Sequence, residues 1–314
     1  MFVFHAVAVP YTWMGVDQFF VLSGYLITGN LLGLRGRGRP GAALGVFYQR
    51  RLLRIVPPYD LALIAIFVLA PVGAAVWPWY LGFASNLRDV FYPLIKGPLL
   101  PMWSIAVEEQ FYLVWPFLVL LVPERHLGKV FLAAIVLAPA LRLALTPISA
   151  NAVYRLMPTR TDLLGLGALM AWLEHREPGR LHRHRGAAIV VGVAAAGVFA
   201  ALAAALPSFE LEHNSALYNT VGYSLEAVFF TAALVVVRTG ERDLLTRVLV
   251  NPVLRYLGTI SYTAYLIHVL VLVEVHRLHL PGAIAVALAL AGTVAVASLS
   301  WFAIERPLQR FKRS

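Results

Sequence analysis

Two adjacent carboxylates, Glu108 and Glu109, lie inside a stretch that is otherwise apolar and long enough to span a lipid bilayer. An acidic side chain in the middle of a membrane helix costs roughly 2.5 to 3.5 kcal/mol on insertion scales. A pair without a role would therefore be expected at the membrane surface. One of the two carboxylates could simply pair with a buried arginine or tyrosine, but we expect a function for one of them and favour Glu108.

Two histidines fall at a similar depth. His5 lies in the apolar N-terminal segment, and His268 lies in an apolar segment that begins after Arg255. At a rise of 1.5 Å per residue, both come close to mid-membrane, as Glu108 does. Polar groups in lipid must face inward and find partners, so we expect the three to share a cavity. A histidine beside a carboxylate is a competent general base; alternatively, each histidine only joins two helices by a hydrogen bond.

We expect substrate binding by His268 and by three charged residues outside the group of His5, Glu108 and His268. Asp17 lies in the first turn of a predicted helix, where an acid would also be favoured by the helix dipole. Arg160 and Asp162 lie where an outer loop enters another helix. They could bind an external substrate, or they could form a local ion pair that closes the loop.

A basic cluster on the other side of the membrane consists of Arg50, Arg51 and Arg54, followed by the pair Pro57 and Pro58. Arginine forks suit phosphate, and the two prolines predict a break in the chain just before a new span. The cluster therefore predicts a phosphate-binding site. Such arginines equally suit the orientation of a helix and its attachment to anionic lipid.

The composition indicates how these residues are positioned. Of 314 residues, 60% are hydrophobic and 13% charged, and the mean hydropathy is +0.75, which is too apolar for a soluble domain. We predict an all-α, polytopic integral membrane bundle in a single domain over residues 1–314, with about ten transmembrane helices, the first of them truncated. The expected spans are 15–34, 57–77, 99–122, 127–146, 186–207, 217–237, 253–275 and 282–304, with a weaker one at 162–173 and the outer part of another helix at 1–13.

The charge distribution predicts the orientation. Most of the 26 basic residues fall in short loops on one side, which places both termini in the cytoplasm of a multi-pass plasma (inner) membrane protein. The net charge of +10 does not indicate nucleic-acid binding, because no contiguous basic face accompanies it. The absence of cysteine excludes disulfides, cysteine metal sites and a cysteinyl acyl intermediate, and we expect no metal.

Six segments, in this order along the chain, resemble the acyltransferase family 3 membrane proteins, which O-acylate bacterial surface polysaccharides, peptidoglycan, lipid glycans and macrolide-type products. These segments are 4–6, 16–28, 50–59, 103–112, 261–268 and 304–308. The resemblance implies about ten helices and an acyl-coenzyme A co-substrate on the cytoplasmic side, with no tightly bound cofactor. It also implies transfer to a hydroxyl of a glycan or glycolipid on or near the outer face.

The resemblance assigns site residues as well. His5 matches the essential histidine of the family, and Glu108 and Tyr112 match the acid and tyrosine of its WS-x-x-VE-x-QFY element. The basic motif thought to meet the phosphates of the coenzyme corresponds to Arg50, Arg51 and Arg54. Family members also carry an arginine before the histidine on the first helix, a position that this chain does not contain.

The expected reaction is acyl transfer, most simply of acetyl from acetyl-coenzyme A. His5 would take the proton of the acceptor hydroxyl, with Glu108 or a neighbour orienting it. The oxyanion that forms when the acceptor oxygen attacks the thioester carbonyl would need a hydrogen-bond donor such as Tyr25, Tyr112 or Tyr262. A transient acyl-His5 or acyl-serine intermediate stays open.

Two rival hypotheses remain. The first is a secondary transporter that moves a proton with a small solute through His5, Glu108 and His268. The second is a truncated, inactive member of the family.

Overall fold

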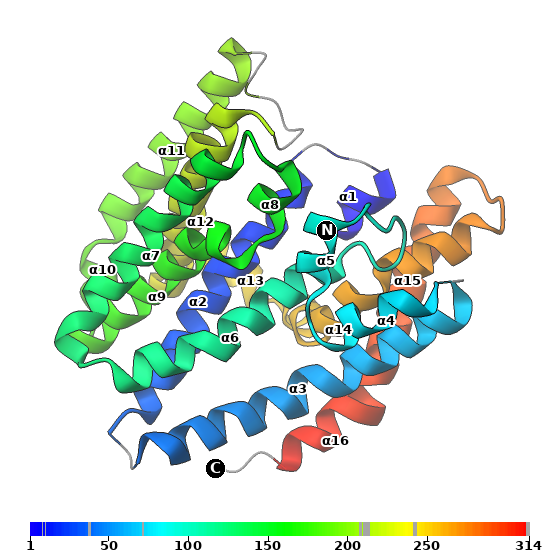
Figure 1. The fold of residues 1–314 in the computed structure, drawn as a ribbon, viewed down its shortest axis with the longest axis horizontal. Coiled ribbons are helices and arrows are strands. Elements are labelled where there is room, and N and C mark those ends of the chain that lie inside the picture. Colours follow the sequence, from blue (N-terminus) through cyan, green and yellow to red (C-terminus); the bar gives the residue numbers. More distant parts are fainter. Residues whose placement is uncertain are drawn as a thin grey trace. The chain divides into compact units, whose positions relative to one another are not determined.

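The computed structural model describes residues 1–7, 9, 11–36, 39–70, 72–206, 209, 214–240 and 244–311. Every regular element in these ranges is a helix, which confirms the all-α prediction (Figure 1). Seven helical segments of this part of the chain are long and apolar enough to cross a membrane, as expected of a multi-pass membrane protein. They are Pro40–Leu69, Met102–Leu121, Glu124–Leu145, Arg185–Ala205, Tyr218–Thr239, Pro252–His276 and Gly282–Phe311.

The predicted total of about ten spans is not confirmed. Helix α2 (Gly15–Leu34) has the expected bounds, but it contains the polar residues Asp17, Gln18 and Asn30 and is not among the seven. Helix α9 (Thr161–Arg176) has only 16 residues. By contrast, α11 (Arg185–Ala205) leaves most of its apolar side chains exposed, as a helix in contact with lipid would.

The helices form two compact units, each assembled from segments that are distant in sequence. Unit 1 contains Met1–Trp13, Leu44–Ala106 and Arg247–Ser314, and unit 2 contains Met14–Ala43 and Val107–Thr246. The helices α3 (Pro40–Leu69), α6 (Met102–Leu121) and α13 (Leu244–Leu249) contribute residues to both units. That the whole chain acts as one domain stays a prediction.

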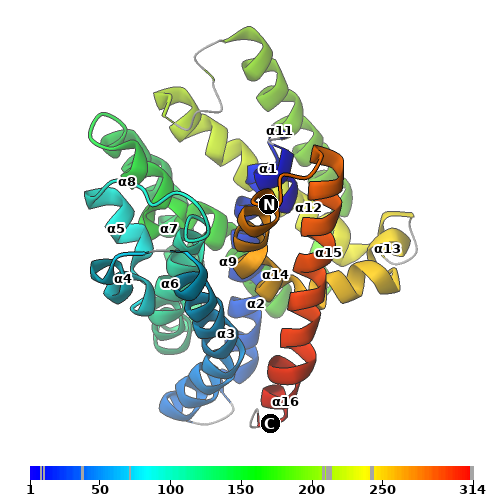
Figure 2. The same cartoon turned by 90° about the vertical axis from the view of Figure 1, so that its right-hand side faces the viewer.

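Unit 2 is built around the direct contact of α2 with α9. A Cβ atom added at Gly24 would lie 1.9 Å from the Leu164 carbonyl oxygen, and one added at Gly167 would lie 2.0 Å from that of Val21. The two backbones touch because neither glycine has a side chain. Around them, α12 (Tyr223–Thr239) packs on both helices, α7 (Glu124–Leu145) on α9, and α11 on α12 (Figure 2).

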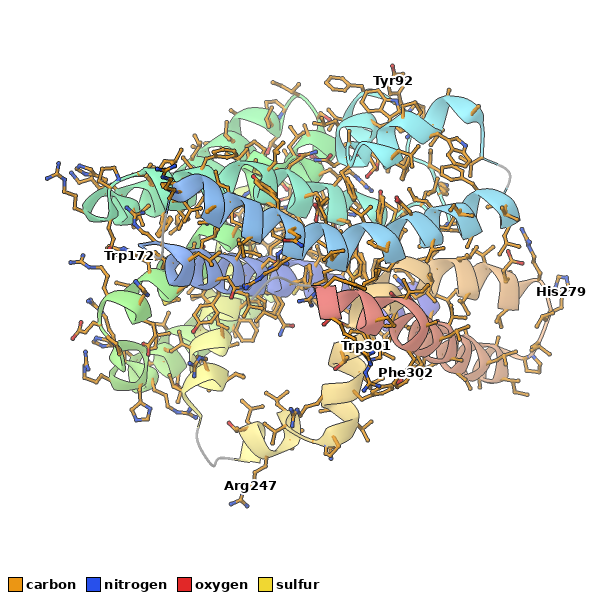
Figure 3. The ribbon with its side chains drawn as sticks, turned by 90° about the horizontal axis from the view of Figure 1, so that it is seen from below. Tyr92, Trp172, Arg247, His279, Trp301 and Phe302 are labelled. Atoms are coloured by element: carbon orange, nitrogen blue, oxygen red, sulfur yellow. The ribbon has the colours of Figure 1, made fainter. Side chains whose placement is uncertain are left out.

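Unit 1 has an apolar core between α3, α4 (Trp77–Leu81), the start of α6 and α14 (Pro252–His276). In this core, Tyr59 of α3 also donates a hydrogen bond to the Tyr80 carbonyl at 2.9 Å. Helix α14 packs against α15 (Gly282–Ser300), and Figure 3 shows His279, which has a φ of 51°, in the turn between them. The short helix α1 (Phe2–Val7) packs on both.

The remaining described helices are short. They are α5 (Ser85–Phe91), α8 (Ala150–Arg155), α10 (Arg180–Arg183), α16 (Arg306–Leu308), the 3₁₀ turns at Thr12–Met14, Ala74–Val76, Met157–Arg160 and Gln309–Phe311, and π-helical turns at Tyr218–Gly222 and Trp301–Glu305.

Two local predictions are wrong. Pro57 and Pro58 do not break the chain, because α3 runs through both of them from Pro40 to Leu69. Each proline removes one helical hydrogen bond, but a long membrane helix packed against neighbours tolerates that loss. The helix expected over residues 1–13 ends at Val7, and Tyr11 has a φ of 66°, outside helical geometry. His5 therefore lies near the end of a short helix.

Candidate functional site

His5 and His268 lie side by side in unit 1. Their ring centroids are 5.2 Å apart, with the ring planes tilted by 50°. His268 is 2% exposed, and its Nδ1 lies 2.7 Å from the Tyr265 carbonyl oxygen. The structure thus brings together two of the residues that the sequence placed at one depth, while their chemical roles stay predictions.

A cavity of about 450 Å³ opens beside this pair. His5 and Ala6 line it from α1, and the rest of the wall comes from α14, α15 and the turn between them. Most of the lining is aliphatic, with His276 and Arg277 as further polar members. A cavity of this size and polarity is in the range of small-molecule sites.

The start of α6 is joined to α14 by a short chain of hydroxyl groups. The Tyr265 and Ser104 hydroxyls lie 2.6 Å apart and are hydrogen-bonded to each other, and each lies 3.1 Å from the Pro101 carbonyl oxygen, which accepts from the hydroxyl whose proton is not shared with the other. These contacts hold the turn of α14 that carries Tyr265 and His268.

Glu108 belongs to unit 2 and is 4% exposed. It accepts a short hydrogen bond from Ser23 of α2, and the Tyr112 hydroxyl lies 3.5 Å from the same Ser23 oxygen. The acid therefore has a serine partner, which the sequence did not suggest. His5 belongs to unit 1, so a pairing of Glu108 with His5 stays a prediction.

The predicted coenzyme residues Arg50, Arg51 and Arg54 lie within one and a half turns of α3. The Arg51 guanidinium lies 5.8 Å from the centre of the Phe47 ring, and Arg54 is exposed. Because residues four apart share a helix face, Arg50 and Arg54 can meet one ligand together. Phosphate binding by this cluster stays a prediction.

Asp17, Arg160 and Asp162 are all buried, and Arg160 and Asp162 do not form the local pair considered from the sequence. Arg160 pairs with Asp17 at 3.2 Å, and Asp162 pairs with Arg142 of α7 at 2.6 Å. Burial lowers the pKa of the Arg160 guanidinium, but Asp17, Tyr223, Tyr154 and Glu226 together outweigh it and raise this pKa above its usual value. Arg160 also lies 4.1 Å from the centre of the Tyr223 ring.

A further acid, Glu226 of α12, joins this buried cluster. It accepts a hydrogen bond from the Tyr218 hydroxyl at 2.6 Å. Its other carboxyl oxygen, Oε2, and Asp17 Oδ2 are buried and have no hydrogen-bond partner among the described residues.

Sequence reasoning did not assign a role to Arg142 or Glu226. Both are charged residues inside predicted apolar spans, Glu226 near the middle of its span and Arg142 about one turn from the end. Arg142 is fully buried and donates to the Asn219 and Thr159 carbonyls as well as to Asp162. The depth argument that singled out Glu108 would have found Glu226.

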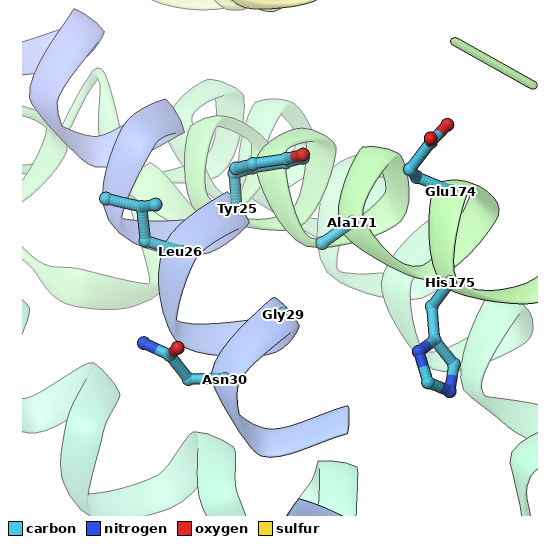
Figure 4. A pocket seen from close by; sticks show the side chains of 7 residues that line it. All are labelled: Tyr25, Leu26, Gly29, Asn30, Ala171, Glu174 and His175. Atoms are coloured by element: carbon cyan, nitrogen blue, oxygen red, sulfur yellow. The ribbon is translucent and has the colours of Figure 1, made fainter. Parts of the chain in front are cut away.

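The tyrosines considered as oxyanion donors already have protein partners. The Tyr262 hydroxyl donates to the Ile55 carbonyl at 3.2 Å, and the Tyr25 hydroxyl accepts from Arg238 Nε at 3.2 Å. Tyr25 lines a second cavity, of about 260 Å³ in unit 2, between α2 and α9 (Figure 4). An oxyanion role for any of these tyrosines stays a prediction.

Comparison with known proteins shows the family. The family model for an acyltransferase domain (acyltransferase family 3) matches residues 12–304, a range that does not include His5. The O-acetyltransferase OatA of Staphylococcus aureus (strain NCTC 8325 / PS 47) is 26% identical over 327 residues, which cover 95% of this chain and 53% of OatA. The protein SACOL0978 of Staphylococcus aureus (strain COL) is 28% identical over 330 residues, with the same coverage.

The chain spans about half the length of these relatives. No solved structure matches it. Because the family match extends over almost the whole chain, the protein belongs to acyltransferase family 3.

Proposed function

We propose that the protein transfers an acetyl group from acetyl-coenzyme A to a hydroxyl of a cell-surface or exported glycan across the plasma membrane. The observation that carries this proposal is the position of His5, beside His268 and at the wall of a cavity, in a chain of this acyltransferase family. The similarity to OatA supports O-acetyl transfer over proton-coupled solute transport.

In the proposed reaction, His5 takes the proton of the acceptor hydroxyl as the oxygen attacks the thioester carbonyl. The new ester C–O bond forms, the thioester C–S bond breaks, and the proton finally passes to the coenzyme thiolate. General-base help of this kind is typically worth about 10² to 10⁴ in rate. The arginines of α3 would hold the coenzyme through its phosphates.

The test uses purified protein in proteoliposomes, with acetyl-coenzyme A as donor and N-acetylglucosamine oligosaccharides as acceptor. Coenzyme release can be followed with a thiol reagent without background from the protein, because the chain contains no cysteine. Acetyl esters on the glycan are counted after mild alkaline release.

We expect both products with the wild type and a loss of about 10² to 10⁴ in rate with His5→Ala. The control is His182→Gln, which changes an exposed histidine of α10. Wild-type protein that forms no ester would overturn the proposed function, and a His5→Ala variant with full activity would overturn the assignment of His5.

A further inference from the structure

The hydrogen bonds of His268 determine which of its two ring nitrogens carries a proton. A carbonyl oxygen can only accept, so the nitrogen that contacts the Tyr265 carbonyl at 2.7 Å, Nδ1, carries a proton. The other nitrogen, Nε2, has no hydrogen-bond partner among the described residues, and the residue is 2% exposed. A charged ring would bury an N–H without an acceptor, so the ring is neutral and Nε2 carries a lone pair.

A buried acceptor without a donor lowers the stability of the fold, so its presence in a native structure indicates a function for that group. A neighbouring group that can supply a donor is the His5 ring, whose centroid lies 5.2 Å from the centroid of the His268 ring. Imidazole rings at this separation reach an N–H···N hydrogen bond by a small rotation. His5 lies in the last turn of the short helix α1, which has no fully buried residue.

We propose that His268 positions the general base: its Nε2 accepts the N–H of His5. This inference rests on the proposed function. The bond fixes the tautomer of His5, so that the other ring nitrogen of His5 presents its lone pair to the acceptor hydroxyl. When His5 takes the proton and becomes cationic, the same bond strengthens, because its donor is then charged.

The orientation of His268 is itself fixed by its surroundings. Its Nδ1 is held by Tyr265, and the Tyr265 hydroxyl is held in turn by Ser104 and the Pro101 carbonyl. The orienting partner of His5 is thus a neutral imidazole of unit 1. The carboxylate of Glu108, considered for this role from the sequence, accepts from Ser23 in unit 2.

The test combines a spectroscopic and a kinetic measurement on the full-length protein. In protein labelled with [¹⁵N]histidine, the His268 signals are identified by their absence in His268→Gln. We expect the proton of His268 on Nδ1, and a change in the His5 signals when His268 is replaced by leucine. A proton on Nε2 of His268, or His5 signals that do not change, would overturn the inference even if no acyl transfer is detected.

The kinetic measurement compares His268→Leu with His268→Gln. Leucine removes the acceptor, and we expect kcat to fall about 10- to 100-fold with KM values within about twofold, as for residues that orient a catalytic group. Glutamine supplies a carbonyl acceptor and should recover most of kcat. In a His5→Ala background, His268→Leu should have no further effect.

The outcomes separate the two hypotheses. Wild-type activity that is lost in His5→Ala but kept in full in His268→Leu overturns this inference and leaves the proposed function intact. Independent, multiplicative losses in the double variant would also overturn it. His182→Gln is the matched control, since it changes an exposed histidine in the same way.

Discussion

The buried ion pair of unit 2 gives a sharp test of the charge assignments. Asp17 Oδ1 lies 3.2 Å from Arg160 Nη1, with the two side chains 2% and 0% exposed. Asp17→Asn keeps the shape of the side chain but removes its charge, so the buried Arg160 cation loses this counter-charge. Removal of one partner from a buried pair costs about 3 to 5 kcal/mol. We expect a loss of this size in the free energy of unfolding.

The matched control is a carboxylate at the surface. Glu177→Gln makes the same chemical change, breaks exposed pairs with Arg180 and Arg183, and should cost about 0 to 1 kcal/mol.

The assay is the apparent Tm of the detergent-solubilised protein, recorded at one scan rate for all variants. At about 2 to 4 °C per kcal/mol, Asp17→Asn should lower Tm by about 6 to 20 °C, while Glu177→Gln should stay within about 4 °C. Equal losses in Asp17→Asn and Glu177→Gln would refute the role given to burial. An unchanged Tm in Asp17→Asn would refute the account of the ion pair itself.

Two further predictions concern α2. Gly24→Ala should prevent recovery of folded, monodisperse protein on size-exclusion chromatography, because its Cβ would overlap the Leu164 carbonyl, whereas Gly29→Ala, with open space around it, should behave as wild type. Ser23→Ala should lower the free energy of unfolding by about 1 to 3 kcal/mol, because it leaves the buried Glu108 carboxylate without this donor; thermal unfolding that matches the wild type would contradict this.

Much of the fold follows from the pattern of apolar segments. The bounds predicted for α2 are those observed, and the depth argument correctly treated Glu108 and His268 as buried. Hydropathy locates apolar segments but not helix ends, so it missed that α3 starts at Pro40 and that α1 ends at Val7.

The partners of the charged residues were harder to predict. Arg160 and Asp162 lie close together in sequence, yet each pairs with a different helix, and Glu108 accepts from Ser23, a partner that the sequence did not suggest. These partners depend on which helices pack together. For α2 and α9 that choice rests on Gly24 and Gly167, two small residues that carry no hydrophobic or charge signal.

The backbone contact between α2 and α9 limits how unit 2 can deform. At Gly24 and Gly167 no side chain separates the two helices, so they cannot slide or rotate against each other without a steric clash, and we expect them to move as one rigid body. Asp17 and Ser23 lie on α2, and Asp162 lies on α9. The spacing of these three residues should therefore stay fixed when the rest of unit 2 rearranges.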